Sequence, residues 1–218
     1  MTLLLKMTTD NIFRVSVRNG RNNKIHIFLN DEYSLTVDST YWFSSEWCTK
    51  KEIDAEEFDL LKEEIENRRA WNNALDLLSI RSHSQKELVQ KLRRKYSQNA
   101  AELAAKKAVG LGLLDDESFA EMYARELLER KKYGISRIKN ELRLKGISHQ
   151  IIESTISSLD IDAKESIISL VERKYARKLG DEKGRRNVVA ALQRLGYSYS
   201  DIMSALNEIS ECEEYEEW

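Results

Sequence analysis

The side chains best suited to chemistry in this 218-residue chain are three histidines and two cysteines. They are His26, His83, His149, Cys48 and Cys212. The histidines are far apart in sequence, and the cysteines lie near opposite ends of the chain, so neither set has the spacing of a metal site or of a disulfide framework. We therefore expect no metal, and the isolated cysteines favour a reducing cytoplasm.

Two short stretches have a superficial likeness to catalytic motifs. Asp115–Asp116 has the composition of a carboxylate pair for metal-assisted hydrolysis, but a helix start explains it better, because carboxylates there accept free backbone N–H groups. The glycine-bounded stretch 180–184 lacks the spacing and the terminal Lys-Ser/Thr of a phosphate-binding loop. We expect no catalytic residue, no cofactor and no enzymatic activity.

Basic side chains carry the remaining signal. The net charge of −2 divides into −5 over residues 1–67, +8 over residues 68–146 and −5 over residues 147–218. A basic central block suits a polyanion or an acidic protein surface, although solvated faces of charged helices remain the alternative. A short basic helix after a turn is also typical of nucleic-acid-binding proteins. The candidate binding residues are Arg81, Lys86, Lys91, Arg93, Arg94, Lys95, Arg130, Lys131, Lys132, Arg137, Lys139, Arg143 and Lys145.

A helical unit that recurs about every fifty residues must position these side chains. The matching positions are Leu88 and Leu92, then Ile138, Leu142 and Gly146, then Val188, Leu192 and Gly196. In the middle copy, Ser136 and Ser148 are expected to cap two short helices that Gly146 separates. Three helices per unit fit the period, and stacked units are expected to share a core and form an elongated, curved body.

The N-terminal part predicts strands instead. Apolar and polar residues alternate over 11–18, 24–29 and 33–37, with turn-forming residues between them, which indicates a small antiparallel meander. An aromatic cluster follows at Tyr41, Trp42, Phe43 and Trp47. We expect these rings to cover the sheet as core, with a stacking surface for bases as the alternative.

The predicted fold is mainly α, which the absence of proline favours. The predicted divisions are a β-meander module at 1–53, a connecting helix at 54–73, helical repeats at 74–117, 118–160 and 161–210, and a mobile acidic tail at 211–218. Capping boxes are expected at Asp54–Glu57, Ser84–Glu87 and Asp162–Glu165. No signal peptide or membrane span is evident, so we expect a cytoplasmic protein that does not contact membranes. We also expect the protein to be a monomer.

Three motifs are spread over residues 74–210. The first contains Leu77-Leu78, Arg81-Ser82-His83-Ser84, Glu87-Leu88 and Leu92; the second runs from Gly112 to Ala120 with Tyr123 and Arg125; the third contains Gly134, Arg137-Ile138, Glu141-Leu142 and Lys145-Gly146-Ile147. Together they resemble the RecX regulatory proteins, bacterial modulators of the RecA recombinase. Tyr96 departs from the family pattern, which often has glycine there, and Arg125 joins the candidate binding residues through this resemblance.

The resemblance implies that the protein lodges along the groove of the RecA–DNA filament. The resemblance also implies that the protein limits the ATP hydrolysis, strand exchange and coprotease activity of RecA in recombination, DNA repair and the SOS response. Direct binding of single- or double-stranded DNA by tandem helix-turn-helix-like repeats is the alternative. Because the middle basic set does not recur in the third copy, charge reversal at Arg137, Lys139 and Arg143 is expected to weaken binding while helical content stays intact.

Overall fold

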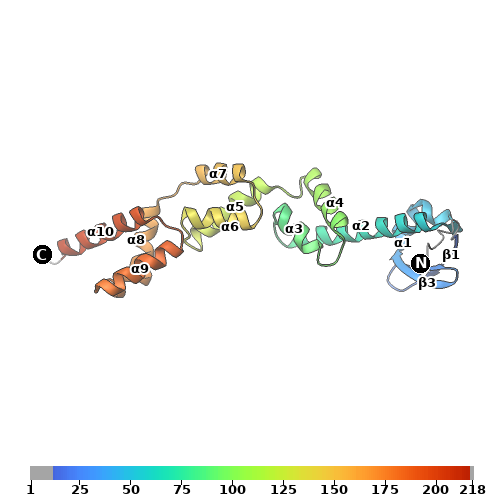
Figure 1. The fold of residues 1–218 in the computed structure, drawn as a ribbon, viewed down its shortest axis with the longest axis horizontal. Coiled ribbons are helices and arrows are strands. Elements are labelled where there is room, and N and C mark those ends of the chain that lie inside the picture. The colour runs from blue at the N-terminus through green and yellow to red at the C-terminus, as the bar shows by residue number, and fades with distance from the viewer. Residues whose placement is uncertain (1–11, 217–218) are drawn as a thin grey trace, which may run out of the picture.

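The computed structural model describes residues 12–216, and side chains up to residue 210. Asn11 of the first predicted strand and the last two residues of the predicted tail lie outside this range, as do the ten residues before Asn11. The protein is elongated, with a small sheet at the N-terminal end and helix α10 at the other (Figure 1). The predicted fold class, helical repeats preceded by an antiparallel β module, is therefore confirmed.

The N-terminal sheet has four antiparallel strands in the order β3-β2-β1-β4. They are β1 (Phe13–Asn19), β2 (Lys24–Leu29), β3 (Glu32–Asp38) and the short β4 (Glu52–Ile53). The three-stranded meander is confirmed, and β4 is an addition, because two residues are too few to show an alternating pattern. Both hairpin turns contain adjacent residues with positive φ, Asn22-Asn23 and Asn30-Asp31, as tight hairpins require.

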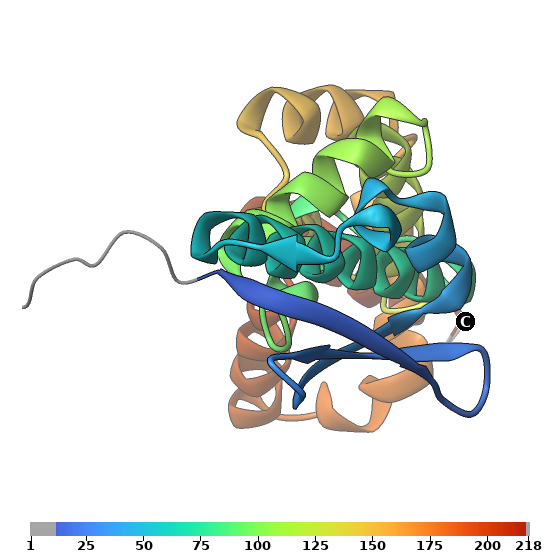
Figure 2. The same ribbon diagram turned by 90° about the vertical axis from the view of Figure 1, so that its right-hand side faces the viewer.

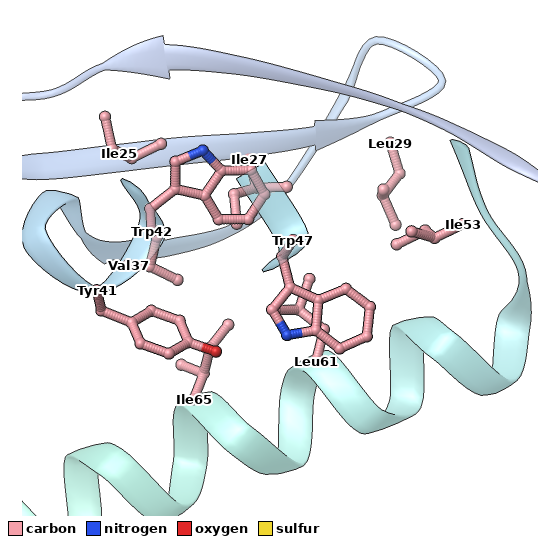
Figure 3. Packing of buried hydrophobic residues seen from close by; sticks show 10 residues of the cluster. All are labelled: Ile25, Ile27, Leu29, Val37, Tyr41, Trp42, Trp47, Ile53, Leu61 and Ile65. Atoms are coloured by element: carbon pink, nitrogen blue, oxygen red, sulfur yellow. The ribbon is translucent and has the colours of Figure 1, made fainter. Parts of the chain in front are cut away.

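The inner face of this sheet packs against helices. Helix α1 (Ser39–Ser44), the 3₁₀ helix η1 (Glu46–Thr49) and helix α2 (Ala55–Ile80) supply the other half of the core. The buried set is Ile25, Ile27, Leu29, Val37, Tyr41, Trp42, Trp47, Ile53, Leu61 and Ile65 (Figure 3). Three of the four clustered aromatics are thus core, as predicted, whereas Phe43 is 65% exposed.

Helix α2 begins at the predicted capping box and continues well past the predicted connector. The Asp54 carboxylate accepts from the Glu57 backbone N–H, and the Glu57 carboxylate accepts from the Asp54 N–H. Leu61 and Ile65 belong to the sheet core, while Ala70 and Ala74 lie in the next core along the chain. A continuous helix therefore joins the sheet module to the first repeat.

The predicted three-helix repeats are present. The first combines the end of α2 with α3 (Gln85–Leu92) and α4 (Gln98–Gly110); the second contains α5 (Asp116–Glu129), α6 (Ile135–Leu144) and α7 (His149–Ser158). The third contains α8 (Ala163–Lys174), the 3₁₀ helix η2 (Ala176–Lys178), α9 (Glu182–Arg194) and α10 (Tyr199–Glu216). Gly146 and Gly196, fifty residues apart, both have positive φ, so the predicted turn recurs.

The expectation of a shared core is wrong. The buried apolar residues form a separate cluster in each repeat, around Leu88 and Leu92, around Ile138 and Leu142, and around Val188 and Leu192. The three helices of each repeat enclose one small cluster, and the contacts between repeats are mainly polar. No helix within residues 12–216 is both long and apolar enough to cross a lipid bilayer.

Several local predictions need correction. Gly134, not Ser136, precedes α6, because that helix already begins at Ile135. Ser148 caps α7 as predicted. Helix α10 extends to Glu216, so residues 211–216 of the predicted tail are helical.

Two predicted capping boxes are half formed. Ser84 and Asp162 each accept the backbone N–H three residues on. The return bond that completes the box is described only for Asp54–Glu57. At Ser84 the reason is plain, since the Glu87 carboxylate binds basic side chains instead.

Candidate nucleic-acid and protein interface

A partly buried carboxylate joins the first two repeats. Glu87 on α3 accepts two hydrogen bonds from the Arg81 guanidinium, at 2.6 and 3.1 Å, and one from Lys145 Nζ at 3.2 Å. Lys145 belongs to the second repeat, and its Nζ also lies 5.5 Å from the ring centre of Tyr123. Two candidate binding residues, Arg81 and Lys145, therefore hold repeats together.

The electrostatics of this contact are strong because the carboxylate is withdrawn from water. The Glu87 side chain is 15% exposed. The hydrogen bonds from Arg81, with further hydrogen bonding and charge from Lys145, lower the pKa of Glu87 to about 2, against a desolvation effect that raises it. The ionised form of Glu87 is thus strongly preferred in the folded protein.

Replacing Glu87 by Gln is expected to lower the free energy of unfolding at pH 7 by at most about 3 kcal/mol. The folded-state pKa lies below the ordinary value of 4.5, so the stabilisation is complete above that pH and is lost as pH falls towards 2. Urea unfolding of both proteins at several pH values tests this. Glu121→Gln, at an exposed position, is the control, and a difference between wild type and Glu87→Gln that persists unchanged at pH 2 contradicts the assignment.

The backbone contacts of the two joints between repeats follow one pattern. Ser84 Oγ donates to the carbonyl of Lys145 at 2.6 Å, and fifty residues on the Gly134 N–H donates to the carbonyl of Leu195 at 2.8 Å. In both joints, the start of the second helix meets the glycine turn of the following repeat. A Cβ at position 134 would clash with the Gly196 carbonyl, so the second joint requires glycine there.

Arg137 belongs to the second joint. Its Nη1 donates to the carbonyl of Arg194 at 2.8 Å, and its guanidinium lies 4.3 Å from the ring centre of Tyr133. Nearby, Tyr197 donates its hydroxyl to the carbonyl of Lys132 at 3.0 Å. Arg137 is therefore a coupling residue between the second and third repeats.

Three further candidates are paired within their own repeats. Lys139 binds Glu153 at 2.6 Å, Arg130 binds Glu126 at 3.0 Å, and Lys91 Nζ donates to His83 Nε2 at 2.8 Å. The His83 Nδ1–H faces the carbonyl of Arg81 at 2.9 Å, and burial lowers the pKa of this imidazole, consistent with a neutral ring.

This pairing affects how the charge-reversal variant predicted from sequence would be interpreted. Of the three positions chosen from sequence, Arg137 holds a joint and Lys139 holds α6 to α7. Reversing their charge would break these internal contacts, so a loss of binding by the triple variant would not by itself identify a contact with a partner. Arg143 is the member of that set whose side chain makes no ion pair in the described part of the chain.

Eight candidates are left for external contacts. Among residues 12–210, their side chains make no hydrogen bond or ion pair, and all except the half-buried Lys132 are exposed. They are Lys86, Arg93, Arg94, Lys95, Arg125, Lys131, Lys132 and Arg143. Arg93, Arg94 and Lys95 follow one another at the end of α3, where positive charge also favours the helix dipole.

A groove between α3 and α4 collects part of this set. Lys86 and Arg93 line it, together with Lys106 from α4. The acidic residues Glu102 and Asp116 line it as well. Lys86 also lies over Gly146, where an added Cβ would meet its side chain. Sequence inspection missed Lys106, although its place on α4, opposite the basic α3, was a usable signal.

The third repeat has a groove at the equivalent place, with different chemistry. At positions one hundred residues further along the chain, Ala190 stands in place of Gln90 and Gln193 in place of Arg93. Met203 also lines the groove of the third repeat. Arg185 and Arg186 remain beside it. The third groove therefore has fewer charged side chains of both signs and a more apolar wall.

The residues considered for catalysis have structural partners. Asp115 caps α5 by accepting from the Glu117 N–H at 3.0 Å and from Ser118 Oγ at 2.6 Å, and these bonds lower its pKa. Asp116 accepts from the Gln85 N–H at 2.8 Å. Within the described part of the chain, no three His, Cys, Asp or Glu side chains form a group that could hold a metal.

Fold and site together define a tandem three-helix repeat protein with a basic central surface. Residues 70–107 match the family model described as "RecX, first three-helix domain", and residues 115–156 match "RecX, second three-helix domain". A "Regulatory protein RecX" of Chlorobium phaeobacteroides is 32% identical over 148 residues, covering 67% of this chain and 97% of that relative. The chain belongs to the RecX family of regulatory proteins.

Other relatives agree with this assignment. Proteins of the same printed name from Clostridium tetani and Bacillus subtilis are 26% and 28% identical over 204 residues each, covering 91% of this chain and 94% and 76% of the relatives. A crystal structure of RecX from Lactobacillus salivarius has a TM-score of 0.59 and 27% identity, covering 66% of this chain and 97% of that one. Another RecX crystal structure, at 21% identity, shares the fold with a TM-score of 0.67 over 89% of this chain and 99% of its own.

Proposed function

We propose that this protein binds the RecA–DNA filament and lowers the recombinase, ATPase and coprotease activities of RecA. Family membership makes it a regulatory protein, and the proposal extends this to a partner and a mode of action. In this proposal the protein acts by binding, without a reaction of its own, in recombination, DNA repair and the SOS response.

The observation that carries the proposal is the set of eight basic side chains that the fold does not use. They occupy the first and second repeats of an elongated body (Figure 1), so they can meet a long, negatively charged partner at several points. The joints between repeats consist of hydrogen bonds and ion pairs rather than a common core. Such joints hold neighbouring repeats in place relative to one another, so that their basic side chains would meet the partner at set positions.

The basic groove of the first repeat favours a second candidate function, direct DNA binding. Lys86, Arg93 and Lys106 line that groove, and phosphates would displace counterions there. The predicted signature is affinity for naked DNA that falls steeply with salt. Undetectable binding at low salt in the absence of RecA would remove this candidate and leave the filament proposal intact.

The deciding experiment measures DNA-dependent ATP hydrolysis by RecA as this protein is added. We expect inhibition at substoichiometric to equal amounts, together with shorter or altered filaments in electron micrographs. Unchanged hydrolysis and unchanged filament length at equal amounts of the two proteins would contradict the proposal. A control variant changes Arg173, Lys174 and Arg177 to Gln, which removes three positive charges from the third repeat. This variant should inhibit RecA as strongly as wild type does.

A further inference from the structure

The outer face of the N-terminal sheet carries rings and basic groups that the core does not use. Because Ile25, Ile27 and Leu29 point into the core, the alternate residues of β2 point outward. In the strand register, Phe28 of β2 lies between Ser16 of β1 and Tyr33 of β3. His26 of β2 lies between Arg18 of β1 and Thr36 of β3. Helices α1 and α2 lie on the opposite side of the sheet (Figures 1 and 2).

The side chains on this face form one connected array. The Phe28 and Tyr33 ring centres are 5.9 Å apart, and those of His26 and Tyr33 are 6.1 Å apart. The Thr36 hydroxyl lies 2.7 Å from His26 Nδ1 and 3.0 Å from the Tyr33 hydroxyl, which fixes both rings in place. The Arg18 guanidinium lies 4.3 Å from the Phe28 ring centre. The Tyr33 side chain is held by these contacts, yet the residue is 61% exposed.

This face also carries basic side chains. The outward positions of β1 and β2 bear Arg14, Arg18 and Lys24. Arg14 is paired with Asp31 at 2.6 Å, and the strand register sets Lys24 opposite Asp38, so Arg18 is the basic group that contacts a ring of this array. Lys24 also lines a cleft at the edge of β3, and the other charged residues of that cleft are Arg68, Arg69 and Asp38.

We propose that this outer face binds a single strand of nucleic acid, with unpaired bases stacked on Tyr33 and Phe28 and phosphates near Arg18 and Lys24. Aromatic rings flanked by basic groups on an antiparallel sheet suit this ligand, since an unpaired base exposes a π-face and duplex pairs do not. The stacking surface considered from sequence therefore exists on other rings and on the opposite face. The inference is independent of the proposed contact with RecA.

The test uses the full chain and no RecA. Fluorescence anisotropy measures binding to 20-nucleotide oligothymidylate, to oligouridylate and to a 20-base-pair duplex. The variant is Phe28→Val with Tyr33→Thr, because β-branched residues retain strand propensity while removing the rings. The control is Phe43→Val, an equally exposed aromatic in the same module, on the helical side of the sheet. Circular dichroism and tryptophan fluorescence confirm that the module remains folded.

We expect the double variant to lose about fivefold or more in affinity for the single strand, with duplex affinity within about twofold of wild type. Loss with oligothymidylate alone assigns DNA, and loss with both oligomers assigns a single strand of either sugar. The proposal is overturned if wild type does not bind the single strand, if the variant binds it equally, if duplex affinity falls in parallel, or if Phe43→Val has the same effect.

Discussion

Neutralising Arg93, Arg94 and Lys95 together, each to Gln, is expected to lower affinity for DNA or for the RecA–DNA filament by about tenfold or more at low salt. These residues are exposed at the end of α3, and their side chains make no hydrogen bond or ion pair in the described part of the chain. Their removal therefore costs external contacts while the repeat keeps its packing. The loss should have the character of counterion release, because each phosphate contact adds about 0.9 to the salt slope on duplex DNA.

The measurement is a titration of affinity against salt concentration for wild type and variant. The plot of log affinity against log salt should become shallower by up to about 3 units. The matched control changes three exposed basic residues of the third repeat, which are Arg173 and Lys174 at the end of α8 and Arg177 in η2. Equal losses from both variants would show that net charge alone matters and that the first repeat has no special place.

The second large effect concerns stability. Leu142→Ala is expected to destabilise the second repeat by about 2–5 kcal/mol, because the Leu142 side chain is fully buried and its removal leaves a cavity. The second repeat has its own core cluster, so the loss should be local. Hydrogen exchange should therefore accelerate in α5, α6 and α7 while the amides of the N-terminal sheet keep their protection.

Leu144 provides the control on the same helix. It is 66% exposed, so Leu144→Ala should change the free energy of unfolding by less than about 0.5 kcal/mol. Exchange that accelerates evenly across the whole chain in Leu142→Ala would contradict the view that each repeat has an independent core.

Local patterns were sufficient for the elements themselves. The alternation in 24–29 reproduces β2, because one face of that strand is buried and the other is not. The fifty-residue recurrence of Ile138, Leu142 and Gly146 reproduces the helices and turns of the repeats, because each copy must bury the same two side chains and reverse at the same point. The capping serine before α7 was equally local.

Contacts between elements distant in sequence had no such signature. The sequence around Lys145 does not reveal whether this side chain faces solvent or binds Glu87, which lies fifty-eight positions away. Arg137 likewise meets the carbonyl of Arg194 only because the joint brings them together. The sequence therefore could not show that six of its fourteen candidates make ion pairs or hydrogen bonds within the fold.

The sequence alone thus determined the family, the sheet-then-repeats order and the charge of the central block, because these depend on residue types and their spacing. The tertiary structure decided which basic side chains are available and which faces of the sheet carry rings. It also showed that the repeats have separate cores with polar joints. Those features depend on which groups meet after folding, and a charged or aromatic side chain gains its role from the partner it finds there.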